Sequence, residues 1–250
     1  MAGTISDLAN AVDIVNDTAI TTGGTVTAAV GDMLVVIVAA ANAGTAGAAS
    51  LTTVVDSDGV NTYTQRALIN YNPGAASAGA TLGIYTCVVT STLSADTITA
   101  NFSVNTPEKS IQVYKIAPGA SEVCTFIAAD TVGVTGNLSA YTANTVSVAS
   151  GDIIFGAAAI ETDDTITGDT DTDSGSWSSI ISRLADNGAD ASTMVCSSQY
   201  KTTTATANQT WHATSTTARD AAISYLVVRS AVPPATVAGR GAFQYRQRRM

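Results

Sequence analysis

The chain has 250 residues, of which 46% are apolar and only 12% are charged, about half of the ~25% that is usual in a soluble domain. Its formal net charge of −9 argues against general nucleic-acid binding, because neutralising phosphates requires clustered Lys and Arg. The longest apolar run, Met33–Ala41, is too short to cross a bilayer, so we expect no membrane span. The first ten residues have neither a basic nor an apolar segment of the secretory type, so cytosolic synthesis is expected.

Strand signals dominate the first half of the chain. Runs of β-branched residues are separated by Gly, Asn, Asp and Pro, as in sandwiches and barrels, and helical periodicity is nearly absent. The predicted strands are Val12–Val15, Thr25–Thr27, Met33–Ala40, Leu51–Val55, Tyr63–Leu68, Thr81–Val89, Thr97–Val104 and Ser110–Ile116. We therefore expect an all-β fold, a β-sandwich or a jelly-roll-like fold.

The second half repeats this order of strands and turns. Thr25-Val26 followed by Gly31-Asp32 returns as Thr145-Val146 followed by Gly151-Asp152 at the same internal spacing. An Ala-rich apolar strand follows each Gly-Asp pair, and the later strands match in order as well. The period is far longer than that of a solenoid, so the pattern indicates one strand set that was duplicated.

Two architectures fit this repeat. The halves, about 10–120 and 121–231, are either tandem sandwiches or two parts of one pseudo-symmetric sandwich whose strands pair across the repeats. Only the short turn at Pro118-Gly119 separates them, which favours one compact body over residues 1–231. Val232-Pro233-Pro234 ends the last strand because proline cannot donate to a ladder, so residues 232–250 are expected to form an extended basic tail.

Candidates for catalysis are few. His212 is the only histidine, which excludes a multi-histidine metal site, and no G-x-S-x-G nucleophile turn occurs. We expect His212 to be a partly exposed strand residue and the chain not to be an enzyme. Cys87, Cys124 and Cys196 are odd in number and lack metal-type spacing, so they are expected to be buried free thiols.

Acidic loops are the candidate metal sites. One loop alternates three carboxylates: Asp169, Asp171 and Asp173. This spacing can converge on a hard cation such as calcium, although Ser174 and Ile180 stand where an EF-hand has its Gly and its last acid. A shorter loop of the same kind contains Asp56, Asp58 and Asn61. The alternative for both loops is a solvated acidic turn, and no cofactor is expected other than a structural calcium ion.

The C-terminal tail carries the candidate partner-binding residues. Four of the eleven basic residues fall in the last eleven positions, with no acid among them. The candidates are Arg240, Phe243, Tyr245, Arg246, Arg248 and Arg249. Arginine and aromatic residues are enriched at interface hot spots, so docking onto an acidic or aromatic-lined partner surface is the expected role. A solvated end and contact with packaged nucleic acid are the alternatives.

The repeated Gly-Asp strand and the stretch from Asp56 to Thr64 resemble β-sandwich proteins encoded among the structural genes of tailed bacteriophages. The pattern in those proteins is a Gly-Asp-apolar strand followed by an Asp-Ser-x-Gly-Asn-Thr-Tyr hairpin. Here Val60 separates Gly59 from Asn61, and the second copy keeps only Asp-Ser-Gly at residues 173–175 and an aromatic residue. The resemblance covers most of residues 25–230.

This resemblance implies a non-enzymatic virion component, a capsid decoration or tail-associated protein that is assembled in the host cytoplasm. Its expected partners are further copies of itself and other virion proteins, such as major capsid or tail proteins. A surface carbohydrate-binding or adhesion module is the alternative, with host-surface glycans as partners. That alternative predicts exposed aromatic residues on one face and a cation in an Asp loop.

Overall fold

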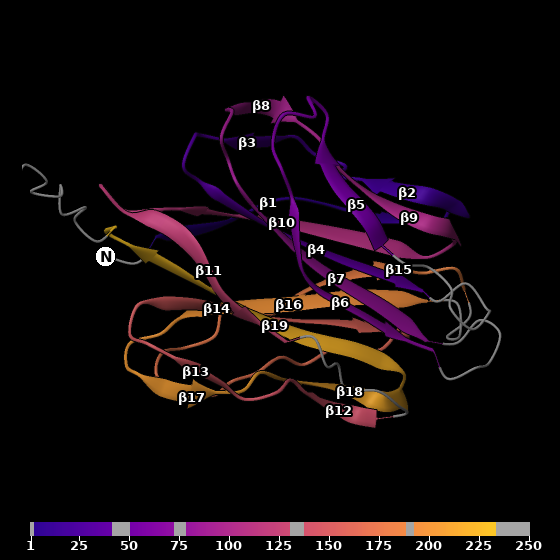
Figure 1. Ribbon diagram of the computed structural model, residues 1–250. Coiled ribbons are helices and arrows are strands. Elements are labelled where there is room, and N and C mark those ends of the chain that lie inside the picture. Colours follow the sequence, from indigo (N-terminus) through magenta and orange to yellow (C-terminus); the bar gives the residue numbers. More distant parts are fainter. Residues whose placement is uncertain (1–2, 42–50, 73–78, 131–137, 189–192, 234–250) are drawn as a thin grey trace, which may run out of the picture.

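The computed structural model describes residues 3–41, 51–72, 79–130, 138–188 and 193–233, and its regular elements are all β-strands (Figure 1). This confirms the prediction of an all-β sandwich fold. The first half contains β1 (Thr4–Asp13), β2 (Asp17–Thr21), β3 (Val26–Ala28), β4 (Met33–Ala41), β5 (Leu51–Asp56), β6 (Thr64–Tyr71), β7 (Ala80–Val88), β8 (Leu93–Asp96), β9 (Ile98–Thr106) and β10 (Lys109–Ala117). The second contains β11 (Val123–Ala129), β12 (Leu138–Thr142), β13 (Val146–Val148), β14 (Asp152–Ile160), β15 (Ile181–Ala185), β16 (Met194–Thr202), β17 (Ala207–Gln209), β18 (His212–Arg219) and β19 (Ala221–Ala231). No helix in the described ranges could span a membrane.

The strands form four layers (Figure 1). The first inner sheet has the order β1-β10-β4-β7-β6, and the second inner sheet has the order β11-β19-β14-β16-β15. A first outer layer, β2-β9-β5 with β3-β8, covers the first inner sheet, and a second outer layer, β12-β18 with β13-β17, covers the second. In the described residues, every strand ladder joins strands of the same half, and the two inner sheets pack face to face.

The central strands of the inner sheets are buried along their whole length. All nine residues of β4 and all nine of β14 are buried, because each strand lies in a middle layer with a hydrophobic cluster on both faces. A strand in such a position needs apolar residues on both sides, which explains the uninterrupted apolar runs in place of alternation.

The Gly-Asp pair forms the same turn in both halves. Gly31 and Gly151 have φ angles of 95° and 88°, in the left-handed region that favours glycine. The Asp32 carboxylate accepts the backbone N–H of Ala29 at 2.9 Å, and the Asp152 carboxylate accepts that of Ala149 at 2.8 Å. The halves therefore share this turn and the strand order of their inner sheets, while the duplication of the sequence itself remains a prediction.

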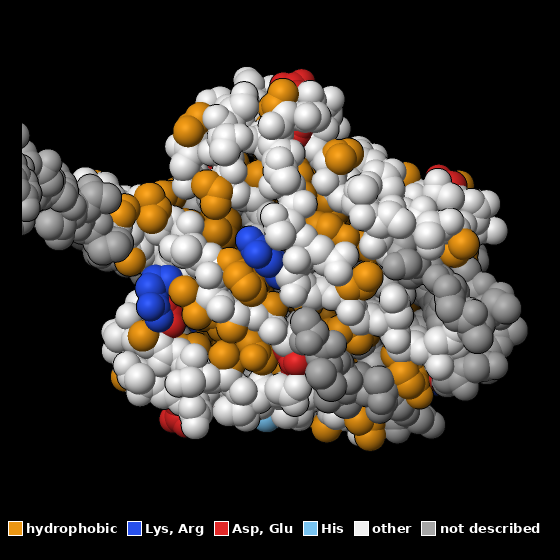
Figure 2. All heavy atoms as spheres, viewed as in Figure 1, with side chains coloured by type: hydrophobic (Ala, Val, Ile, Leu, Met, Phe, Trp, Pro, Cys, Tyr) orange, Lys and Arg blue, Asp and Glu red, His pale blue; other side chains and the backbone are white. Residues whose placement is uncertain are grey.

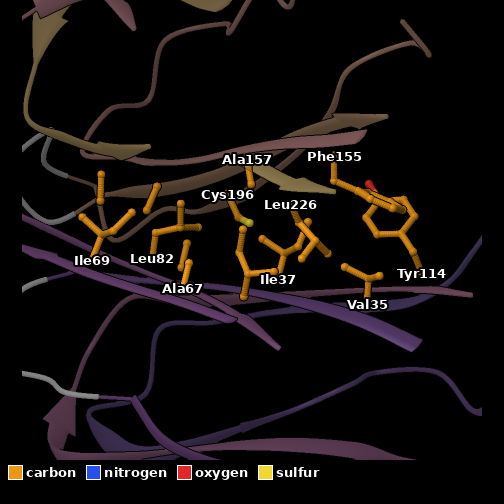
Figure 3. Packing of buried hydrophobic residues seen from close by; sticks show 14 of the residues in the cluster. Val35, Ile37, Ala67, Ile69, Leu82, Tyr114, Phe155, Ala157, Cys196 and Leu226 are labelled. Atoms are coloured by element: carbon orange, nitrogen blue, oxygen red, sulfur yellow. The ribbon is translucent and has the colours of Figure 1, made fainter. Parts of the chain in front are cut away.

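The largest hydrophobic cluster lies between the two inner sheets. In Figure 3, Ile37 and Leu82 of the first half meet Cys196 and Leu226 of the second. Tyr114 adds polar contacts to this interface: its hydroxyl lies 2.6 Å from Oγ of Ser198, and its ring centroid lies 5.3 Å from that of Phe155. The three cysteines are free and buried, as predicted.

The edges of the inner sheets lie over one another in a reciprocal way. Edge strand β1 contacts β15, where Arg183 lies 3.6 Å from Asp7, and edge strand β6 contacts β11, where the guanidinium of Arg66 lies 4.2 Å from the ring centroid of Phe126. Exchanging the halves maps each of these strand contacts onto the other, as in an isologous dimer interface. The inner sheets are therefore related by an approximate two-fold arrangement.

Two buried glutamates accept hydrogen bonds across the halves. Glu161, 7% exposed, accepts the backbone N–H of Gly79 at 3.0 Å, and Glu108, 1% exposed, accepts the side-chain amide of Asn187 at 3.0 Å. Burial raises the pKa of both carboxyls, that of Glu161 to about 7.

One predicted strand was wrong near the N-terminus, and others were missed. Val12–Val15 was predicted as a strand, but β1 ends at Asp13, whose carboxylate turns the chain by accepting the N–H of Val15 at 2.8 Å. Strands β2 and β8 were not predicted because they are short and carry polar and acidic residues among the apolar ones. Strand β19 ends at Ala231.

Candidate functional site

The second outer layer has a strand fewer than the first. In the first half, β5 lies between β4 and β6 in the chain and forms the third strand beside β9. In the second half, residues 161–180 between β14 and β15 contain no strand, and one isolated bridge, Thr167 to Thr214, joins them to β18. This irregular segment covers the second inner sheet less completely, and a pocket opens there.

The pocket, which we call the Trp177 pocket, has a volume of about 500 Å³. Its wall includes Asp169, Asp171, Trp177, Ser178, Ile180 and Gln199. A second cavity of about 350 Å³ shares Ile166 and Ile180 with it and extends to Leu184 and Val195. Together, the two cavities have apolar walls around Ile166 and Ile180 and a polar end at Asp169 and Asp171.

Gln199 on β16 fixes the irregular segment to the inner sheet. Its Oε1 accepts the N–H of Asp169 at 2.7 Å and the indole N–H of Trp211 at 2.9 Å. Its Nε2 donates to the carbonyl of Asp169 at 3.1 Å and to that of Ser178 at 2.8 Å. A Cβ at Gly168 would overlap the amide of the Gln199 side chain, which would have to shift to make room for it. This one buried amide therefore holds both sides of the pocket in place.

Asp169 connects the pocket to the start of β18. Its Oδ2 accepts the backbone N–H of His212 at 2.9 Å and lies 3.0 Å from Nδ1 of the same residue, while its Oδ1 accepts the N–H of Asp171 at 2.9 Å. The His212 side chain is 53% exposed, as predicted for a partly exposed strand residue. Asp169 thus orients the imidazole ring toward the segment.

Lys201 supplies a positive charge beneath Asp171. Its side chain is fully buried, and its Nζ lies 3.0 Å from Oδ1 of Asp171 and 3.1 Å from the carbonyl oxygen of Asp173. The same Nζ lies 4.6 Å from the ring centroid of Trp177, in a cation–π contact. Burial by itself would raise the pKa of Asp171, but the hydrogen bond and charge of Lys201 outweigh it and lower that pKa.

The structure brings together two of the three predicted metal-binding carboxylates. Oxygen atoms of Asp169 and Asp171 and a ring nitrogen of His212 all lie within 4.8 Å of one another, and these three side chains could hold a metal ion. Asp173 is exposed and contacts this group through its backbone: its N–H donates to Asp171, and its carbonyl accepts from Lys201. Calcium binding remains a prediction, and the ammonium of Lys201 already lies beside these acids.

Sequence reasoning missed Gln199, Lys201 and the link from Asp169 to His212. His212 and Asp169 are 43 positions apart, and Gln199 and Lys201 come from β16, which is 30 positions from the acids they contact. No local spacing could indicate these contacts. The only available signal was that His212 is the single histidine of the chain.

The loop at Asp56 forms a turn held by its own side chains. The Asp56 carboxylate accepts the backbone N–H groups of Val60 and Asn61 at 3.1 and 3.3 Å. Asn61 in turn accepts the N–H of Thr90 at 2.9 Å, and Gly59 has a φ of 67°. This geometry is that of the acidic turn that was the alternative to a cation site.

The predicted partner-binding residues lie outside the described residues. These are Arg240, Phe243, Tyr245, Arg246, Arg248 and Arg249. In comparisons with known proteins, no family model, curated protein or solved structure matches the chain.

Proposed function

We propose that the chain is a non-enzymatic structural component of a phage virion, an outward-facing decoration protein that its basic C-terminal segment attaches to other virion proteins. The position of the two chain ends supports this most directly. Thr4 pairs with Ala117, and Ala231 pairs with Val123, so both ends of the described chain lie at the short turn that joins the halves. The segment after Pro233 therefore begins at this junction, next to the end of the second inner sheet. The Trp177 pocket lies in the second outer layer.

The surface also suits a protein that works among neighbouring subunits. Figure 2 shows few charged side chains on the face that carries β6, β7 and β11, and apolar side chains gather along the middle of that face. Val123 and Ile127 of β11 are 48% and 39% exposed. An edge strand with exposed apolar residues favours contact with another protein.

The composition of the tail supports attachment through it. The forked guanidinium group of arginine binds carboxylates through two parallel hydrogen bonds, and flat aromatic rings fill apolar pockets at low entropic cost. The four arginines lie among residues 240–249 together with Phe243 and Tyr245, and no acid interrupts them. This is the chemistry of a short anchoring segment on an acidic surface.

Rebinding to particles tests the proposal. Particles assembled without this protein are mixed with one of three purified chains. These are the full chain, a chain that ends at Pro233, and a variant in which the four tail arginines are lysines. We expect the full chain to saturate its sites, the truncated chain to bind at least about tenfold more weakly, and the lysine variant to fall between them because it keeps the charge but loses the forks.

Two results would contradict different parts of the proposal. If the truncated chain binds particles at full occupancy, the tail is not the anchor. If the full chain does not bind any particle component, the protein has no structural role in the virion.

A further inference from the structure

The Trp177 pocket exists because the irregular segment replaces a strand. In the first half, β5 completes the outer layer with regular ladder hydrogen bonds to β9. In the second half, the segment is held by Gln199, by Lys201 and by the bridge to Thr214. The segment is thus well fixed by buried side chains while leaving an open volume beside it, which is typical of a preformed ligand site.

The indole N–H of Trp177 is buried beside Asp171. Its Nε1 is buried and has no hydrogen-bond partner of normal geometry, although the indole lies close enough to Asp171 to help lower the pKa of that carboxyl, after burial and Lys201. Buried indole N–H groups normally find an acceptor. The Asp171 carboxylate is the acceptor beside this N–H, so Trp177 offers a ligand its ring and not its N–H.

The charge of the pocket restricts the ligand. Asp169 and Asp171 contribute carboxylates to its wall, which repel phosphates, sulfates and carboxylates. Lys201 already donates to Asp171, so the carboxylate is compensated and a cationic ligand would gain little. The favoured ligand is therefore neutral.

The lining of the pocket further restricts the ligand to one that combines hydroxyl groups with an apolar face. Asp171 can accept hydrogen bonds and the Ser176 hydroxyl can accept or donate them, while Trp177, Ile166 and Ile180 provide apolar surface. A volume of about 500 Å³ lies within the range of small-ligand pockets, and the adjoining cavity gives room for a second ring.

We propose that the Trp177 pocket binds a neutral saccharide, with Asp171 as a hydrogen-bonding partner of its hydroxyl groups and the Trp177 ring as apolar surface. This site is separate from the tail and does not depend on attachment to a particle. A protein with both features would be held by one end and would bind glycans with the second half.

The test applies labelled full-length protein to an array of neutral, sialylated and sulfated glycans and then measures affinity for the best neutral glycan in solution. Two variants change these contacts: Trp177→Phe reduces the aromatic surface, and Asp171→Asn removes the carboxylate charge and with it the ion pair to Lys201. The matched control is Asp173→Asn, in the same loop but outside the pocket wall. Thermal melts establish that all three variants fold.

We expect binding to at least one neutral glycan, a loss of at least about fivefold in affinity for Trp177→Phe and Asp171→Asn, and wild-type affinity for Asp173→Asn. Binding should persist in EDTA, because Lys201 provides the positive charge. Binding to no neutral glycan, binding to anionic glycans alone, dependence on calcium, or equal losses in all three variants would each overturn the proposal. None of these results alters the particle-binding test, so the two proposals fail separately.

Discussion

Nζ of Lys201 donates a hydrogen bond of 3.0 Å to Oδ1 of Asp171 and also lies over the ring of Trp177, 4.6 Å from its centroid. One ammonium group thus joins β16 to the irregular segment and neutralises the carboxylate that lines the pocket. Because the lysine side chain is fully buried and Asp171 is only 37% exposed, this ion pair should contribute strongly to local order.

Replacing Lys201 by Met should therefore destabilise the protein by roughly 1 kcal/mol, since it leaves a partly exposed carboxylate without its ammonium partner. Urea unfolding measures this. Millimolar calcium should stabilise the Lys201→Met variant more than the wild type, because Asp169, Asp171 and His212 then lack the internal cation. Lys115→Met is the control, since that lysine is 25% exposed and lies 4.0 Å from Asp32. A Lys201→Met variant as stable as the wild type would contradict this role.

Glu161 should make the stability of the inter-half junction depend on pH. Burial raises the pKa of Glu161 to about 7, with the charges of Asp220 and Glu108 adding to the effect and the Gly79 N–H and Arg219 opposing it. The folded state therefore holds this proton more tightly than the unfolded state, whose glutamate titrates near its ordinary pKa. The contribution of the protonated Glu161 to the free energy of unfolding is fully present at low pH and is lost as the pH rises toward and through about 7.

The Glu161→Gln variant tests this, because its amide oxygen can still accept the Gly79 N–H. From pH 4.5 to pH 8, the free energy of unfolding of this variant should rise by about 1–2 kcal/mol relative to that of the wild type, allowing for solvent screening. In Glu122, the Ser230 hydroxyl is the main cause of a lowered pKa, so Glu122→Gln should differ from the wild type in pH dependence only below about pH 5 and serves as the control. Urea unfolding across this pH range measures both. Parallel pH curves for Glu161→Gln and the wild type would refute the assignment.

Gly156 on β14 is required by the packing of Trp211. A Cβ at this position would overlap the indole ring of Trp211, which is fully buried and bonded to Gln199. We expect Gly156→Ala to cost about 2–3 kcal/mol and to shift the tryptophan emission to longer wavelength as the ring moves. Gly24→Ala is the matched control, because the nearest atom to its new Cβ is 3.9 Å away. Equal stabilities of the two variants in urea would show that the ring is not held as described.

The features that could be predicted from the sequence are those that depend on neighbouring residues. The Gly-Asp turns were predictable because a left-handed glycine and an Asp that accepts an N–H three residues earlier form a local unit. The apolar runs of β4 and β14 were predictable as buried strands because their length and β-branched or small residues fit no other element.

The pocket could not be predicted in this way. The acids at Asp169 and Asp171 were visible as a pattern, but their roles depend on Gln199, Lys201 and His212, which reach them only through the pairing of β16 with β14 and of β18 with β12. The absence of a strand between β14 and β15 was also hidden, because Asp173-Ser174-Gly175 resembles the turn that follows β5 in the first half. Two similar short motifs can therefore occur where the structures around them differ.

Quantitative mass spectrometry of purified virus particles tests the proposed virion role most directly. The full chain should be present at a fixed ratio to the major capsid protein, and this ratio should remain constant through successive purification steps. If the chain is missing from the particles, or if its ratio falls with each step, it is not a structural component of the virion.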